Sequence, residues 1–388
     1  MKKYLIVIFC AFPLTTIAKN DTTQADHYFK VADSLYFKAK YEEANFYYSK
    51  ASDIYHELQD WSSSLKCNEY IAFNLGKMAM YDPALDLLNL SVDIGMDKLG
   101  KDHKALSGLY NTFGVIYRNK GDYDKALEFY RKSLHLKFKY YPSESLPIAV
   151  SYNNLGIIYR HSGDYKKSLE YYQKALAIRE KFLEPDHPNI ARSYGNVGVV
   201  YNKIGQYDDA LKYFFKAADI LKLNMPPDHP DILTTYNNIG IGYKELENYK
   251  QALKYYRISL LLRIKKLGKH HPDVGQSCIN IGAVLFNKGK YKKGHSYINK
   301  ALEIYQHNFG LKHPFVGGTL NRLGDLFFKK KDYRKASDCY HQAVIGLVSE
   351  FNNNSVYSCP GLVGINSKLF LLNSLEGKAD ALFKSFNQ

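Results

Sequence analysis

The sequence predicts an all-α fold, a solenoid of about eight helix pairs that ends in a C-terminal capping helix. The first reason is a glycine that recurs with a 42-residue period in the 388-residue chain, and a fixed period of that length indicates a repeat architecture. The second reason is a tyrosine that stands nine positions after each of these glycines. The glycines are Gly114, Gly156, Gly198, Gly240, Gly282 and Gly324, and the tyrosines are Tyr123, Tyr165, Tyr207, Tyr249, Tyr291 and Tyr333.

Each repeat contains two segments with apolar residues at helical spacing, separated by a polar break such as Lys120-Gly121-Asp122. Small residues at the glycine position, and again twelve and nineteen positions after it, allow neighbouring helices to approach closely. The residue sixteen positions after the glycine is aromatic in most repeats and fills the space between layers: Tyr130, Tyr172, Phe214, Tyr256 and Tyr340, with Ile298 as the exception. One helix pair cannot bury its apolar face, whereas stacked pairs bury a continuous core.

The repeat pattern extends towards the N-terminus, where Ala72 and Ala32 replace the glycine. We therefore expect a signal peptide at 1–18, the solenoid at 19–346, and a loop with a capping helix at 347–388. The capping helix is predicted from Asn366 to Phe386, where leucines recur at helical spacing.

The first residues have the layout of a secretory signal peptide. Met1-Lys2-Lys3 is positively charged, an apolar run follows, and Ala18 provides a small residue before the expected cleavage site. The apolar run is too short to cross a bilayer comfortably. We expect an exported protein, periplasmic or extracellular in a bacterium, with no transmembrane segment in the mature chain.

The small-aromatic-small pattern resembles that of tetratricopeptide repeats. The 42-residue period and the loop sequence Asp186-His187-Pro188, which recurs in phase as His229-Pro230, His271-Pro272 and His313-Pro314, resemble the repeats of kinesin light chains. This resemblance implies a right-handed superhelix and a non-catalytic scaffold that binds a peptide or protein segment in its concave groove. The region after Ala343 also resembles the junction in bacterial CHAT-domain proteins, where such repeats precede a caspase-like protease. An alternative function is therefore the regulatory repeat half of an effector whose protease is missing or separately encoded.

No catalytic, cofactor-binding or metal-binding residue is expected, because the sequence contains none of the usual nucleophile, zinc or phosphate-loop motifs. The recurring histidines lie one repeat apart, which is too far for a shared zinc ion, and we interpret them as loop residues before a helix. They are His187, His229, His271 and His313. The cysteines Cys67, Cys278, Cys339 and Cys359 are interpreted as buried small residues, although one disulfide in an oxidising compartment stays open.

The predicted binding site lies along the first helix of each repeat. At 100° per residue, asparagines and basic residues fall on or beside the face opposite the packing positions. They are Asn111, Asn153, Asn154, Asn196, Asn238 and Asn280, with Arg118, Arg160, Arg192, Lys203 and Lys244. One interpretation is that the asparagine amides hydrogen-bond between adjacent helices and fix their register. The other is that they bind the backbone of an extended peptide, and both can hold together.

The basic residues favour an acidic or carboxylate-ended partner segment, although a solvated basic face would give the same pattern. The formal net charge of +15 is spread along the chain and selects no partner by itself. We expect a protein or peptide partner and no small-molecule substrate. The export signal argues against nucleic acid, which the basic charge alone would permit.

Overall fold

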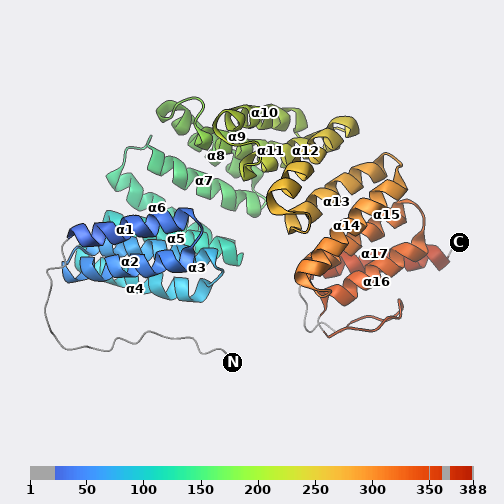
Figure 1. Cartoon of the computed structure of the whole chain (residues 1–388), viewed down its shortest axis with the longest axis horizontal. Helices are drawn as coiled ribbons and strands as arrows, with labels where there is room; N and C mark the ends of the chain where they lie inside the picture. Colours follow the sequence, from blue (N-terminus) through green and yellow to red (C-terminus); the bar gives the residue numbers. More distant parts are fainter. Residues whose placement is uncertain (1–21, 349, 361–367, 387–388) are drawn as a thin grey trace. The chain divides into compact units, whose positions relative to one another are not determined.

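The computed structural model of the chain describes residues 22–348, 350–360 and 368–386. All regular elements in these ranges are α-helices (Figure 1). In order they are α1 Thr22–Phe37, α2 Tyr41–Glu57, α3 Trp61–Lys77, α4 Tyr81–Leu99, α5 Lys104–Lys120, α6 Tyr123–Tyr140, α7 Leu146–His161, α8 Tyr165–Phe182, α9 Pro188–Lys203, α10 Tyr207–Asn224, α11 Pro230–Glu245, α12 Tyr249–Leu267, α13 Pro272–Asn287, α14 Tyr291–Phe309, α15 Pro314–Lys329, α16 Tyr333–Leu347 and α17 Lys368–Phe386. The predicted signal peptide lies outside the described residues.

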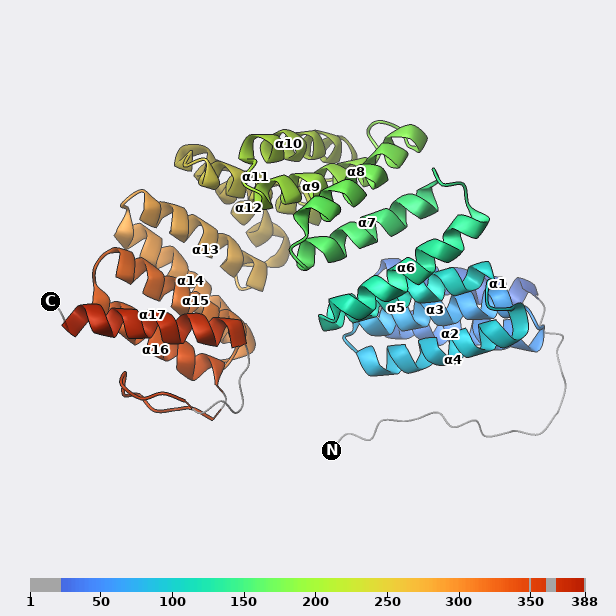
Figure 2. The same ribbon diagram turned by 180° about the vertical axis from the view of Figure 1, so that it is seen from behind.

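Within the described ranges the helices form eight consecutive pairs followed by a terminal helix, as the sequence predicts. The chain divides into two compact units, with the boundary between Phe182 and Leu183. The first unit contains α1 to α8 and the second contains α9 to α17. In each unit, each helix packs against the next one in the sequence. In the second unit, α17 packs against both α15 and α16 (Figure 2).

The repeated glycine is required because an aromatic ring lies against it. A Cβ atom placed on Gly156 in α7 would lie 2.7 Å from Cδ1 of Tyr172 in α8. The equivalent distance from Gly114 to Tyr130 is 2.6 Å, and real Cβ atoms do not approach so closely. The constant spacing of the glycines therefore reflects a close contact between the two helices of a repeat, and this contact recurs along the chain.

The first helix of each repeat ends in a residue with left-handed backbone conformation. Gly121 and Gly205, seven positions after the repeat glycine, have φ angles of 84° and 82°, which glycine adopts without steric cost. Glu247 and Lys331 occupy the same position with φ angles of 56° and 62°. These two residues carry a backbone strain that glycine avoids.

Candidate functional site

Two of the predicted asparagines hydrogen-bond to asparagines in the preceding repeat. Nδ2 of Asn154 in α7 donates to Oδ1 of Asn111 in α5 at 2.9 Å. Nδ2 of Asn280 in α13 donates to Oδ1 of Asn237 in α11 at 2.8 Å. In both cases an asparagine two positions before its repeat glycine bonds to one three positions before the previous repeat glycine. The register-fixing interpretation is therefore confirmed for these two pairs.

The pairing is interrupted at Asn238. The residue that should face it in α9, three positions before Gly198, is Gly195, which has no amide. In the described part of the chain, the side chain of Asn238 makes no hydrogen bond, and it is half-buried in α11. A Cβ atom added to Gly195 would meet nothing within 4 Å, so there is open space here. Asn153 and Asn196 are also half-buried, and each takes part in a further interaction.

The predicted basic residues of the first unit have no carboxylate partner among the described residues. Arg118 and Arg160 stand near the C-terminal ends of α5 and α7 and are half-buried. Nη2 of Arg118 donates to Oδ1 of Asn119 at 3.2 Å, and Nη2 of Arg160 lies 3.1 Å from Nε2 of His161. Their charges are therefore not neutralised by an ion pair.

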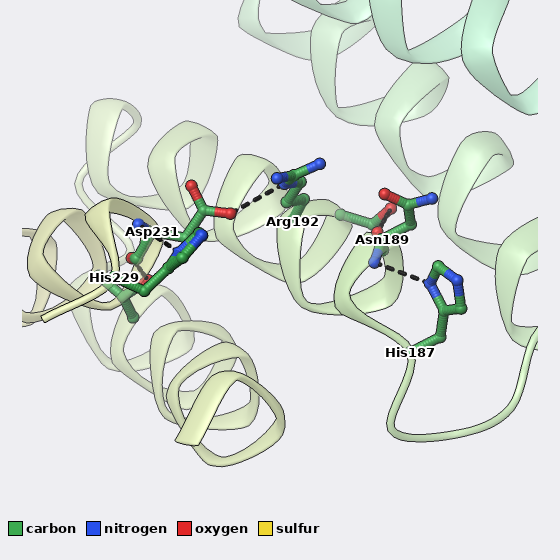
Figure 3. Close-up of polar contacts among 7 residues, drawn as sticks. His187, Asn189, Arg192, His229 and Asp231 are labelled. Atoms are coloured by element: carbon green, nitrogen blue, oxygen red, sulfur yellow. Dashed lines mark hydrogen bonds and ion pairs between the residues drawn. The ribbon is translucent and has the colours of Figure 1, made fainter. Parts of the chain in front are cut away.

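In the second unit, two of the three predicted basic residues are paired. Nε of Arg192 donates to Oδ2 of Asp231 at 2.9 Å (Figure 3), and Nζ of Lys244 lies 2.7 Å from Oε1 of Glu245. Lys203 is exposed. The sequence pattern places the basic residues on one face but does not show which carboxylates reach them.

Two tyrosines that the repeat pattern indicates as packing residues have a hydroxyl group without a hydrogen-bond partner among the described residues. Tyr130 and Tyr172 are each 1% exposed, and neither hydroxyl oxygen has a hydrogen-bond partner among the residues that the structure describes. Burial raises the pKa of Tyr130 to about 12, and the positive charge of Arg118 acts in the opposite direction. Burial likewise raises the pKa of Tyr172 against the effect of Arg160, whose guanidinium lies close by without the geometry of a hydrogen bond.

The recurrent histidines cap helices, which agrees with their interpretation as loop residues before a helix. Nδ1 of His187 accepts a hydrogen bond from the backbone N–H of Asn189 at 3.0 Å, and Nδ1 of His229 accepts one from that of Asp231 at 3.2 Å (Figure 3). His271 and His313 make the equivalent bond. The proline that follows each histidine occupies the first helical turn, where a missing N–H costs nothing.

The cysteines in the described part of the chain are free thiols, and the predicted burial is confirmed for two of them. Cys67 and Cys278 are buried, which raises their thiol pKa to about 12 and about 11. Cys339 is half-buried, and the prediction is wrong for Cys359, which is exposed in the segment after α16. Among the residues that the structure describes, no three His, Cys, Asp or Glu side chains lie together as a metal site would require.

A polar cleft of about 490 Å³ lies at the C-terminal end of the second unit, between α15, α16 and α17. One of the polar residues that line it, Asn321, attaches α17. Nδ2 of Asn321 donates to the carbonyl oxygen of Phe370 at 2.9 Å, and Oγ of Ser374 donates to Oδ1 of Asn321 at 2.7 Å. We therefore regard this cleft as the junction of the terminal helix. No described helix combines the length and the apolar character needed to span a bilayer.

Three family models, each described as a tetratricopeptide repeat, match the chain. Together they cover more than half of it, at residues 107–140, 147–222, 232–273 and 276–344. A search of curated proteins found no match. Because the matched models concern repeats alone, the resemblance to CHAT-domain proteins stays a prediction.

Several solved structures are similar to this one. The apo form of RapI has a TM-score of 0.61 at 13% identity, over 94% of this chain and 98% of that chain. The kinesin-light-chain-like repeats of Podosopora anserina give 0.47 at 18% identity, over 53% of this chain and 98% of that one. BtubC (BKLC) from P. vanneervenii gives 0.48 at 21% identity, over 64% and 91%. The similarity to RapI supports the all-helical repeat fold.

Proposed function

Because the chain belongs to the tetratricopeptide repeat family, whose repeats form protein-interaction scaffolds, we propose that it binds an extended peptide or protein segment along the first helices of its repeats. The scaffold is non-catalytic. The chain is exported and meets its partner in the periplasm or outside the cell, as the N-terminal sequence favours.

The unpaired amide of Asn238 carries this proposal. A side-chain amide offers two donors and an acceptor, and it can bond to both the C=O and the N–H of an extended backbone. Elsewhere in the repeats, as at Asn154 and Asn280, an asparagine two positions before the glycine bonds to the preceding repeat. The side-chain amide of Asn238 makes no hydrogen bond within the described residues. Gly195, at the position of the missing partner, has open space around it.

The basic residues add selection by charge. Arg118 and Arg160 have no ion pair among the described residues, so an acidic segment would gain charge-assisted hydrogen bonds without first breaking a salt bridge. Arg192 and Lys244 contribute less, since Asp231 and Glu245 already pair with them.

The test is affinity capture from an envelope fraction with the mature protein as bait. Asn238→Ala should reduce recovery of the specific partner about tenfold, because it removes hydrogen bonds of about 1 kcal/mol to the ligand, and should leave the melting temperature unchanged. Asn280→Ala is the matched control for structure, since it leaves Asn237 without its partner and should lower the melting temperature. Recovery that is equal for the wild type and Asn238→Ala would contradict the proposal.

A further inference from the structure

The repeats at the two ends of the chain show how the fold pairs its buried tyrosine, which stands sixteen positions after the repeat glycine or the alanine that replaces it. The hydroxyl of Tyr340 in α16 donates to Oδ1 of Asp325 in α15 at 2.8 Å. The hydroxyl of Tyr48 in α2 donates to Oδ1 of Asp33 in α1 at 2.5 Å. Each aspartate directly follows the repeat glycine or its alanine substitute. In these repeats the fold provides its buried tyrosine with a carboxylate.

Two repeats of the first unit have the tyrosine without the carboxylate. Tyr130 and Tyr172 occupy the same position, but Val115 and Ile157 stand where the aspartate would be. The two hydroxyls are consequently buried without a partner. Burial removes the hydrogen bonds that a hydroxyl group makes with water, and without a new partner this costs free energy of folding. Such groups are rare in native structures and require a physical explanation.

The same two repeats carry a positive charge next to the tyrosine. Arg118 and Arg160 stand four positions after the repeat glycine, whereas the terminal repeats have Tyr36 and Phe328 there. Residues four apart lie on one helix face, so Arg118 is adjacent to Gly114, against which the ring of Tyr130 lies. Where the repeat lacks its internal carboxylate, it has a guanidinium without an ion pair on the same side.

We propose that the Tyr130–Arg118 pair and the Tyr172–Arg160 pair are two carboxylate-binding subsites that take aspartate or glutamate side chains of an acidic peptide. This inference rests on the proposed function and specifies the ligand of its first unit. A ligand carboxylate accepts a hydrogen bond from the tyrosine hydroxyl, as Asp325 does from Tyr340, and a second one from the guanidinium. The arginine side chains, long and free of ion pairs, rotate to admit it.

The first experiment needs no ligand. Val115→Asp restores the aspartate of the terminal repeats beside Tyr130 and Arg118, so it should leave the melting temperature of the mature protein unchanged or raise it. Val199→Asp is the matched control, since Val199 is half-buried like Val115. Val199 packs against Phe214, which has no hydroxyl group, and its repeat has Asn202 at the position of the arginine. The control should lower the melting temperature by roughly 4–8 °C. Equal losses in the two variants would overturn the assignment.

The second experiment measures binding by fluorescence anisotropy at about 0.15 M salt, to screen non-specific attraction. The probes are two labelled peptides of Gly, Ser and either Glu or Gln in the same positions. The wild type should bind the Glu peptide at least tenfold more tightly than the Gln peptide, and Tyr130→Phe/Tyr172→Phe should remove most of this preference. Because phenylalanine keeps the ring against Gly114 and Gly156, the double variant should fold at least as stably as the wild type. Val115→Asp should also weaken binding, since it fills one subsite.

The outcomes separate this inference from the proposed function. If the two peptides bind equally well, and binding still depends on Asn238, the carboxylate subsites are wrong and the proposed function stands. If neither peptide binds and envelope capture finds no partner that depends on Asn238, both are wrong. The subsites would also be wrong if the double phenylalanine variant kept its preference for the Glu peptide. They would be wrong as well if inorganic phosphate competed with the Glu peptide more strongly than succinate does.

Discussion

The side-chain amide of Asn154 donates a hydrogen bond to the side-chain oxygen of Asn111, 2.9 Å away, and so links the first helices of two consecutive repeats. Both residues are half-buried, so neither amide is easily compensated by water. From the sequence, Asn154 could either bind a ligand or join neighbouring helices. In the structure it joins two helices.

We expect Asn111→Ala and Asn154→Ala each to lower the free energy of unfolding by about 1–2 kcal/mol, because each leaves a partly buried amide group unpaired. The double variant should lose less than the sum of the two, since removing both partners leaves no orphan. Urea denaturation of the four proteins completes the double-mutant cycle. Additive losses would mean that the two side chains do not interact.

The repeat glycines should differ in their response to alanine. Gly156→Ala should destabilise the protein by about 1–3 kcal/mol, because the added Cβ would lie 2.7 Å from the ring of Tyr172. Gly195→Ala should instead stabilise it by about 0.5–1 kcal/mol, since alanine is the better helix former and its Cβ meets nothing within 4 Å. Thermal unfolding of both variants checks the prediction, which fails if Gly156→Ala is the more stable.

The left-handed helix ends predict a stabilising substitution. Glu247→Gly should raise the free energy of unfolding by about 0.5–1 kcal/mol, because it relieves a φ angle of 56° that costs little in glycine. Gly205→Ala, at the same position of the previous repeat, should lower it by a similar amount. Urea denaturation at one pH measures both, and a loss of stability in Glu247→Gly would show that the glutamate side chain contributes more than its strain costs.

Glu69 should make stability depend on pH near neutrality. In α3 it accepts a hydrogen bond from Oγ1 of Thr112 at 3.4 Å, and burial raises the pKa of its carboxyl to about 7, against the lowering effect of Lys137. The folded state therefore holds the proton more tightly than the unfolded chain does. The stability contributed by the protonated group is present below about pH 4.5 and is lost as the pH rises to 7 and above.

Glu69→Gln, which keeps the shape but cannot ionise, should consequently gain stability relative to the wild type as the pH increases from 5 to 8, by up to about 3 kcal/mol. Melting temperatures of both proteins across this range test the sign. A difference that is constant with pH would show that Glu69 titrates normally in the folded protein.

The sequence predicts the repeated contacts well because they recur in phase. The contact between Gly156 and Tyr172 recurs at a fixed spacing, and so does the position of His187 at the start of its helix. Few folds are compatible with a spacing that is repeated so often. Asn238 is different, because its lack of a partner depends on the single substitution at Gly195 in the helix that precedes it in the stack. The sequence contains this signal, but it is visible only when two positions in different repeats are compared as neighbours.

The charge partners could not be predicted in the same way. Arg192 in α9 pairs with Asp231 in α11, 39 residues away, and the repeat period does not determine which carboxylate lies within reach of it. The unpaired hydroxyl of Tyr130 could have been found from the sequence, since Val115 is in phase with Asp33 and Asp325. The comparison requires knowing that the position directly after the glycine faces the tyrosine hydroxyl, and the structure supplies that fact.

The capping histidines make the starts of several helices depend on an uncharged imidazole ring. A protonated imidazole has no acceptor nitrogen, so protonation of His187, His229, His271 or His313 removes the bond that begins its helix. All four belong to the second unit, whereas in the first unit only His103, among the described residues, caps a helix in this way. The second unit therefore contains four helix starts that depend on a neutral histidine ring, against one in the described part of the first unit.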